Sequence, residues 1–219
     1  MYPVYARKIA HRGYTGKGAP ANSIAAFKEA ISEGFDILEL DLHLCADHHI
    51  IIFHDRHING VPVESLSSNR VKQLFPETAT LLELFTDITD IRNVQLYFDL
   101  KGRDELGRVL WRFLIQNNIS THNLMAGSFN VNHLSALQGS GVRLGLITCS
   151  KHTITQYYDL LCDLYFMSID KSILDKDVVA VCRGLGKKIF VFTCTDTHDE
   201  TYIRSFDVDG IVSDILLTT

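Results

Sequence analysis

The chain has 219 residues, of which 46% are hydrophobic and 21% are charged, and its formal net charge is −5. This is an ordinary globular composition, and the length suits one domain spanning 1–219 better than two. The small negative charge argues against nucleic acid as the main partner. No run in the sequence approaches the ~18 apolar residues of a membrane span, so we expect no stable insertion into a membrane.

The five cysteines are widely spaced, and the sequence contains no C-x-x-C motif. This spacing argues against a disulfide framework or a zinc site and favours reduced thiols. The opening residues, MYPVYARKIAHRG, contain no apolar stretch of the signal-peptide kind. We therefore expect a cytoplasmic protein, and the sequence leaves its oligomeric state open.

Short apolar runs, separated by amphipathic helical patterns, predict strands along the whole chain. In chain order the runs are 8–10, 37–42, 50–53, 94–100, 124–127, 142–147, 164–169, 188–193 and 209–213. The segments between them carry helix-start signals. The candidate caps are Asn22, Asp175 and the capping boxes Thr80–Glu83 and Thr197–Glu200.

The short gap between runs 37–42 and 50–53 decides the expected architecture. Only residues 43–49 separate the two runs, whereas a parallel crossover needs about a dozen residues or more. The second run should therefore return antiparallel, as a hairpin excursion that turns near Asp47, His48 and His49. Without it, eight strands remain in βα units, which predicts a single (β/α)₈ TIM barrel with a short hairpin excursion after strand two. An open doubly wound sheet is the alternative, but no glycine-rich phosphate loop follows the first run.

Three carboxylates interrupt the apolar strands. Glu39 and Asp41 lie two residues apart in ILELDL, so both side chains point to the same face, and Asp99 lies in VQLYFDL. Neighbouring carboxylates inside a barrel are unfavourable unless a cation binds them. Oxygen ligands suit one Mg²⁺ or Ca²⁺ ion rather than zinc. The alternative is that these carboxylates pair with lysine or arginine.

Two histidines are expected at the same end of the barrel. His11 ends the first strand, and active sites of such barrels lie at the carboxyl ends of the strands. The returning hairpin should bring His54 back to the level of Asp41. One histidine can then act as a general base while the other, protonated, acts as a general acid.

Positive charge is expected at the same rim, from Arg12 and Lys101. Lys101 lies two residues beyond Asp99, so both side chains point the same way. The lysine either forms an ion pair with a carboxylate or binds a phosphate oxygen and offsets charge in a transition state. A metal, two cations and two histidines together favour phosphodiester cleavage over acyl or glycosyl transfer.

These residues belong to a series of motifs between residues 9 and 214: IAHRG, PANSIAAF, ELDLHL, IIFHD, YFDLKG, GSF and DGIVSD. The series resembles the glycerophosphodiester phosphodiesterase family. The resemblance implies a TIM barrel that binds one divalent cation. It also implies a small-molecule substrate, a glycerophosphodiester, which is hydrolysed to sn-glycerol 3-phosphate and an alcohol.

The resemblance also implies roles for individual residues. By it, His11 and His54 are the acid–base pair, and Glu39 and Asp41 are metal ligands. Asp99 stands where the family usually has a glutamate ligand. The substrate-binding residues are then Arg12, Lys101, which stands at the position of the family lysine, and Phe192.

The sequence departs from the family pattern at two informative positions. The family motif P-E-N-T reads Pro20-Ala21-Asn22-Ser23 here, so Ala21 lacks the carboxylate of a metal ligand. We expect water at that position or weaker metal binding. The family's W-T pair is Phe192-Thr193, which keeps an aromatic surface without the indole N–H.

Two other functions remain open at this point. Sphingomyelinase D-like phospholipases share the barrel and a similar ligand set, so a sphingomyelinase D or lysophospholipase D-like activity is one alternative. A catalytically weakened barrel that only binds phosphodiesters is the other, and Ala21 motivates it. The alcohol that is released, and the choice between Mg²⁺ and Ca²⁺, stay undecided.

Overall fold

The computed structural model describes residues 6–157 and 161–218. Its strands are β1 (Arg7–Ala10), β2 (Ile37–Leu44), β3 (Ile50–Ile52), β4 (His57–Ile58), β5 (Val61–Pro62), β6 (Gln95–Leu100), β7 (Leu124–Ser128), β8 (Arg143–Thr148), β9 (Phe166–Asp170), β10 (Lys188–Cys194) and β11 (Gly210–Ser213). Its α-helices are α1 (Ile24–Ser32), α2 (Ser68–Leu74), α3 (Leu81–Asp87), α4 (Leu106–Gln116), α5 (Val131–Ser135), α6 (Lys151–Gln156), α8 (Lys176–Gly184) and α9 (Thr197–Arg204). The 3₁₀ turns are η1 (Val63–Ser65), η2 (Ile91–Asn93) and η3 (Lys171–Ile173).

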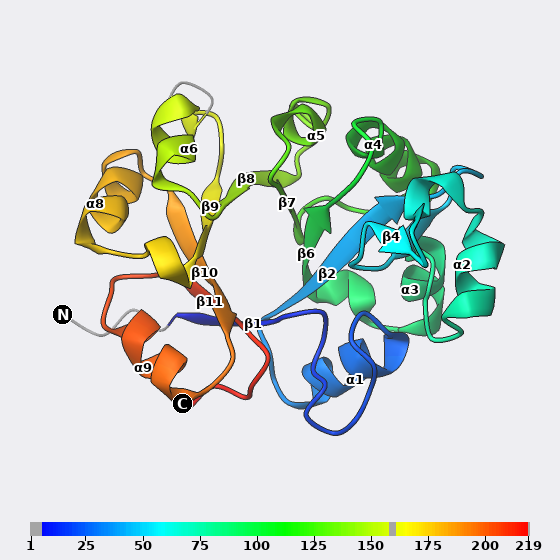
Figure 1. Ribbon diagram of the computed structural model, residues 1–219, viewed down its shortest axis with the longest axis horizontal. Coiled ribbons are helices and arrows are strands. Elements are labelled where there is room, and N and C mark those ends of the chain that lie inside the picture. The colour runs from blue at the N-terminus through cyan, green and yellow to red at the C-terminus, as the bar shows by residue number, and fades with distance from the viewer. Residues whose placement is uncertain (1–5, 158–160, 219) are drawn as a thin grey trace.

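Eight parallel strands form a closed ring in the order β1, β2, β6, β7, β8, β9, β10 and β11. The ring closes because β1 pairs in parallel with both β2 and β11. In Figure 1 the strands surround the centre of the molecule and the helices lie around the outside. The predicted (β/α)₈ barrel is therefore confirmed.

The hairpin excursion is confirmed as well. Strand β3 lies outside the ring and pairs antiparallel with β2, with Leu42 opposite Ile52 and Leu44 opposite Ile50. The chain turns between Cys45 and His49, where two backbone hydrogen bonds close the turn. Directly after β3, the amide of Phe53 donates to the carbonyl of Asp41. The chain therefore returns to the ring of strands at the level of the acidic residues.

The two faces of the strands form separate cores. Leu38, Leu40 and Leu42 point outward and belong to the large apolar cluster that packs the helices against the ring. Inside the ring lies a smaller cluster, which consists of Ile9, Ile37, Tyr97, Met125, Ile147, Phe166, Phe190 and Val212. The barrel interior below the site is therefore filled by side chains, as is usual for this fold.

Two glycines make room for the largest rings of this interior. A Cβ at Gly127 would lie 2.8 Å from the ring of Tyr97, and a Cβ at Gly145 would lie 2.4 Å from the ring of Phe166. Such distances are far below a normal contact, so any side chain at these positions would displace the ring. The two aromatic rings meet edge to face, with centroids 5.2 Å apart.

The helix caps agree with the sequence in part. Thr80 forms the predicted capping box with Glu83, and Asp175 accepts a hydrogen bond from the amide of Val178. The second predicted box, Thr197–Glu200, is wrong. Asp196 caps α9 instead, because an ionised carboxylate one position earlier accepts from the free amide of the first turn.

The prediction that Asn22 caps α1 is also wrong. Ser23 is the N-cap and accepts from the amide of Ala26. Asn22 instead adopts a left-handed backbone conformation, with φ of 60°, which asparagine tolerates better than most residues. This conformation turns the Asn22 side chain toward Asp41.

Candidate active site

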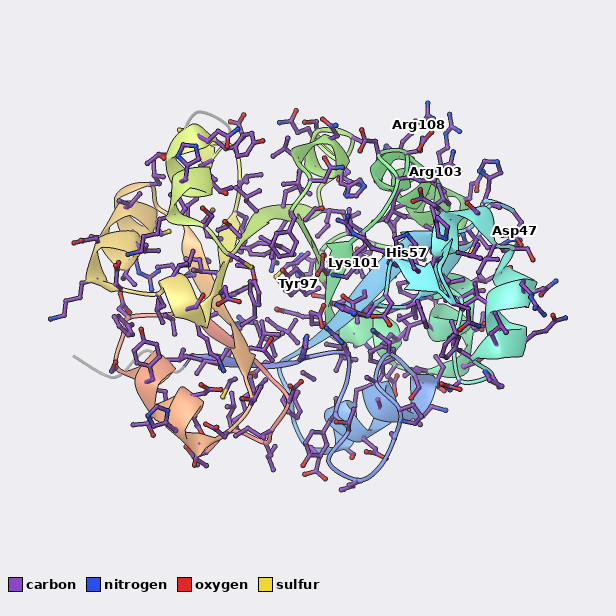
Figure 2. The ribbon with its side chains drawn as sticks, viewed as in Figure 1. Asp47, His57, Tyr97, Lys101, Arg103 and Arg108 are labelled. Atoms are coloured by element: carbon purple, nitrogen blue, oxygen red, sulfur yellow. The ribbon has the colours of Figure 1, made fainter. Side chains whose placement is uncertain are left out.

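The carboxyl ends of the barrel strands surround a cavity of about 240 Å³. All eight residues predicted from the sequence line it: His11, Arg12, Glu39, Asp41, His54, Asp99, Lys101 and Phe192. They come from β2, β6 and β10 and from the segments that follow β1, β3 and β6. Figure 2 shows two lining residues, Lys101 and Tyr97, near the centre of the ring of strands. The structure thus brings the predicted residues together, and their roles remain predictions.

The three carboxylates form one buried cluster. Strand register places Asp41 directly opposite Asp99, and Glu39 lies two residues earlier on the same face of β2. Each residue offers one oxygen, and these oxygens all lie within 4.8 Å of one another. All three side chains are almost inaccessible to solvent. Such a cluster resists full ionisation because the charges repel and water is excluded.

The pKa values of the three carboxylates reflect their mutual repulsion and burial, and the attraction of nearby cations. Burial, together with the charges of Asp41 and Asp99, raises the pKa of Glu39 well above its usual value. Burial also raises the pKa of Asp99, to about 7, although Lys101 opposes the rise. At Asp41 burial acts in the same direction, but the charges of Lys101 and Arg12 outweigh it and lower the pKa.

Two cations share the acidic cluster. The Lys101 ammonium lies 2.7 Å from Asp99 Oδ2 and 3.1 Å from Asp41 Oδ1, and Arg12 Nε lies 3.2 Å from Asp41 Oδ2. Asp41 and Asp99 therefore form ion pairs with lysine or arginine, which was the alternative to metal binding that the sequence left open. Glu39 accepts from the backbone amide of Arg12 at 2.8 Å. Within the described residues no lysine or arginine nitrogen lies within ion-pair distance of Glu39.

The donor set fits a hard divalent cation. Asp99 Oδ1 is buried and has no hydrogen-bond partner in the described part of the chain. A buried carboxylate oxygen without a partner is costly, and a cation removes that cost. When all three carboxylates are ionised, the two cations leave one negative charge in excess, which a divalent cation would offset. Oxygen ligands of this kind suit Mg²⁺ or Ca²⁺.

Both histidines are held through the same ring nitrogen. His11 Nδ1 lies 2.6 Å from Asp214 Oδ1, and His54 Nδ1 lies 2.8 Å from Asp55 Oδ1. A carboxylate at Nδ1 favours the tautomer with the proton on Nδ1, which leaves Nε2 for proton transfer. Sequence reasoning missed both partners, although they stand in the DGIVSD and IIFHD motifs.

A third histidine supports the segment that carries His54. His43 lies on β2, is almost fully buried, and its Nε2 lies 3.3 Å from the carbonyl oxygen of His54. Burial lowers the pKa of His43 to about 4. The imidazole is therefore neutral at physiological pH, so that its Nε2–H can donate to that carbonyl.

The opposite wall of the cavity is aromatic. Phe129, from the GSF motif, meets Phe192 edge to face with ring centroids 6.3 Å apart. Asp170 and Ser168 of β9 also line the cavity, as does Tyr97, whose side chain forms a hydrogen bond with Ser168. Of these residues only Phe192 was expected from the sequence. The GSF motif could have indicated Phe129, whereas Tyr97, Ser168 and Asp170 reach the cavity through strand register.

A smaller cavity of about 170 Å³ adjoins the site where the family motif has its glutamate. Ala21, Asn22, Arg12 and His54 are among the residues that line it. Asn22 Nδ2 donates to Asp41 Oδ2 at 2.8 Å, so this loop is fixed against the acidic cluster. The short side chain of Ala21 thus faces an open space next to Arg12 and Asn22, both of which contact Asp41.

Fold and cavity together define a (β/α)₈-barrel enzyme whose site combines buried acids, cations and supported histidines. The model of the glycerophosphoryl diester phosphodiesterase family matches residues 11–218. The chain therefore belongs to this family of phosphodiester hydrolases, and the resemblance seen in the sequence is confirmed.

Individual relatives agree over nearly the full length. The chain is 25% identical over 227 residues to the glycerophosphodiester phosphodiesterase of Caldanaerobacter subterraneus subsp. tengcongensis, which covers 94% of this chain and 93% of that protein. A crystal structure of the Thermotoga maritima glycerophosphodiester phosphodiesterase matches the fold with a TM-score of 0.78 at 22% identity, covering 97% of this chain and 96% of that one.

A third relative was solved with a ligand. It is an Oleispira antarctica phosphodiesterase in complex with the product sn-glycerol-3-phosphate. The match has a TM-score of 0.79 at 21% identity and covers 95% of this chain and 92% of that one. Within the described residues, no helix has the length and apolar character required to span a bilayer.

Proposed function

We propose that this chain hydrolyses glycerophosphodiesters to sn-glycerol 3-phosphate and an alcohol, with one bound Mg²⁺ or Ca²⁺ and a pair of histidines. The observation that carries the proposal is the joint placement of three buried carboxylates and two carboxylate-supported histidines in one cavity. The family and the glycerol phosphate named for the Oleispira antarctica relative support the substrate class.

Glu39, Asp41 and Asp99 would hold the cation through oxygen atoms. When bound, the cation would polarise a phosphoryl oxygen and stabilise charge that develops on it. Asn22 keeps Asp41 in place by two hydrogen bonds: its Nδ2 donates to the Asp41 carboxylate, and its Oδ1 accepts from the Asp41 backbone amide. These contacts orient the carboxylate without adding charge.

Arg12 and Lys101 bind the remaining phosphoryl oxygens in this account. Both already lie beside the acidic cluster, where a phosphodiester anion can share them with Asp41 and Asp99. Fixed positive charge in a cavity with little water stabilises the charge that grows in the transition state.

His11 and His54 move the protons. One neutral imidazole takes a proton from the attacking water at Nε2, and the new P–O bond forms. The other, protonated, gives its Nε2 proton to the leaving alcohol oxygen as the old P–O bond breaks. Asp214 and Asp55 hold the two rings and stabilise the imidazolium form that each passes through.

Phe192 packs against the carbon atoms of the substrate, together with Phe129. This aromatic wall faces the charged side of the cavity, which suits a molecule with an anionic centre and less polar ends. We also expect the enzyme to act in the cytoplasm, on a substrate that reaches it from solution.

A lysophospholipase D activity is the second candidate. A segment of 52 residues, which is 24% of this chain, is 40% identical to the rat lysophospholipase D GDPD1. The half-exposed ring of Phe129 at the cavity mouth could contact an acyl chain. Turnover of lysophosphatidylcholine at a rate equal to or above that of glycerophosphocholine would favour this activity.

Calorimetry with Mg²⁺ and Ca²⁺ tests the metal assignment. Glu39→Gln and Asp41→Asn should each abolish binding, because each removes one charge from a set of three. Asp177→Asn, an exposed acid in the first turn of α8, is the matched control and should bind as the parent does. Parent-like binding by both Glu39→Gln and Asp41→Asn would exclude the proposed single-metal site.

A further inference from the structure

The amino ends of the barrel strands surround a separate cavity of about 250 Å³. It lies at the end of the barrel opposite the active site, since its residues start the strands rather than end them. Side chains from the starts of β1, β6, β8 and β10 line it: Arg7, Gln95, Arg143 and Lys188. Ile37, Met125 and Phe190 separate it from the interior above.

The cationic side chains point toward the barrel axis. Arg7 lies two residues before Ile9, and Lys188 lies two residues before Phe190, both of which belong to the interior cluster. Arg143 lies four residues before Ile147, another interior residue. Residues at even spacing on a strand share a face. Arg7 and Lys188 are exposed and Arg143 is half-buried, so the three cations form a solvent-facing rim below the apolar layers that fill the barrel.

Two of these cations have neutral partners. The Arg7 guanidinium donates to Gln95 Oε1 at 2.8 Å. Arg143 donates to the carbonyl of His122 at 3.0 Å, and its guanidinium lies over the ring of Tyr165, 5.4 Å from the centroid. In residues 6–157 and 161–218, neither arginine has a carboxylate within ion-pair distance.

Among the described residues that line the cavity, Asp209 is the one acid, and two cations share it. Lys188 lies 2.8 Å from Asp209 Oδ1, while Asp209 Oδ2 lies 2.6 Å from Arg183. Asp209 also accepts from the backbone amide of Ile189 at 2.8 Å. One carboxylate thus serves two cations, and the cavity keeps an excess of positive charge that Asp209 does not neutralise.

We propose that this basic ring, consisting of Arg7, Arg143 and Lys188, is a binding site for a small phosphate dianion. Guanidinium groups present paired N–H donors that match phosphate oxygens, and their neutral contacts hold them in place before the anion arrives. The cavity is concave and lies far from the proposed catalytic residues, so the inference does not depend on the proposed function. Occupancy would stabilise the closed barrel by mass action.

Titration with inorganic phosphate at constant ionic strength tests the site. The titration uses the Lys101→Gln variant in the presence of a chelator. This substitution removes a cation from the active-site end of the barrel, so that phosphate binding there is weakened. On that background we expect saturable binding, which Arg7→Gln/Arg143→Gln weakens at least about tenfold, because two charge-assisted hydrogen bonds are lost. Arg108→Gln/Arg112→Gln removes the same charge from the outside of α4, where Figure 2 shows Arg108 at the edge of the molecule, and should leave the Kd within about twofold.

A measurement on the unmodified chain keeps the test independent of variant folding. The side-chain Nε–H resonances of Arg7 and Arg143 should shift saturably with phosphate, and that of Arg108 should not. The inference is overturned if the two arginine resonances do not respond. It is equally overturned if Arg7→Gln/Arg143→Gln and the control double variant lose affinity to the same extent.

Discussion

In the cation-free protein, the stability of Asp99→Asn relative to the parent should improve as the pH rises from 5 to 8. Burial raises the pKa of Asp99 from 3.8 to about 7, with Lys101 acting against the rise and Asp41 for it. Between these two pH values the folded chain keeps a proton that the unfolded chain has released. The contribution of Asp99 to folding therefore becomes less favourable as the pH rises from about 4, and it levels off above about 7.

The size of the effect follows from the two pKa values. The gap between 3.8 and about 7 corresponds to roughly 4 kcal/mol, at about 1.4 kcal/mol per pKa unit. At least half of this change in folding free energy, roughly 2 kcal/mol, falls between pH 5 and pH 8. Asparagine has nearly the same shape and no charge, so it removes this dependence while leaving Lys101 with one carboxylate fewer.

The assay is denaturant unfolding at pH 5 and pH 8, in chelator and in excess Mg²⁺. In chelator, the stability of Asp99→Asn relative to the parent should improve by roughly 2 kcal/mol from pH 5 to pH 8. In Mg²⁺ the improvement should vanish or reverse, because a bound cation favours the ionised carboxylate. Asp177→Asn supplies the control for an exposed acid.

Two outcomes would contradict a raised pKa and a metal contact at Asp99. If the difference between Asp99→Asn and the parent is independent of pH in chelator, Asp99 does not carry the raised pKa. If Mg²⁺ leaves the pH dependence of that difference unchanged, Asp99 does not contact the cation.

Three further predictions concern the catalytic groups and the departure from the family motif. His11→Ala and His54→Ala should each lower kcat by about 100-fold or more, as expected for general acid–base groups, and a folded variant with near-parent kcat would exclude that histidine. Asp214→Asn should lower kcat about tenfold or more with little change in KM, because it removes the carboxylate from His11 Nδ1; steady-state kinetics that show only a change in KM would contradict this. Ala21→Glu should tighten Mg²⁺ in calorimetry, since the adjoining cavity of about 170 Å³ offers room for a fourth carboxylate, and an unchanged Kd would show that the loop does not place it within reach.

The architecture was predictable because the decisive information is local. The seven residues 43–49 are too few for a crossover, and that gap alone placed β3 outside the ring. Likewise, the spacing of Glu39 and Asp41 fixes their common face without any knowledge of other strands. The structure adds Asp99 opposite Asp41 through the register of β2 and β6.

The missed features depend on contacts between distant parts of the chain. Asp214 reaches His11, 203 residues away, only because closure of the ring brings β11 beside β1. Asn22 and Ser23 are both competent N-caps, and the choice between them is made by Asp41, which binds Asn22. Neither outcome could be read from local sequence, since the deciding partner lies elsewhere.

The proposed metal-dependent hydrolysis can be measured by incubating the chelated protein with glycerophosphocholine and assaying sn-glycerol 3-phosphate with a coupled dehydrogenase. We predict no release in chelator, and release once Mg²⁺ or Ca²⁺ is added back. Release that chelation does not change would contradict the metal dependence. Release of phosphocholine and glycerol in place of sn-glycerol 3-phosphate would contradict the proposed reaction.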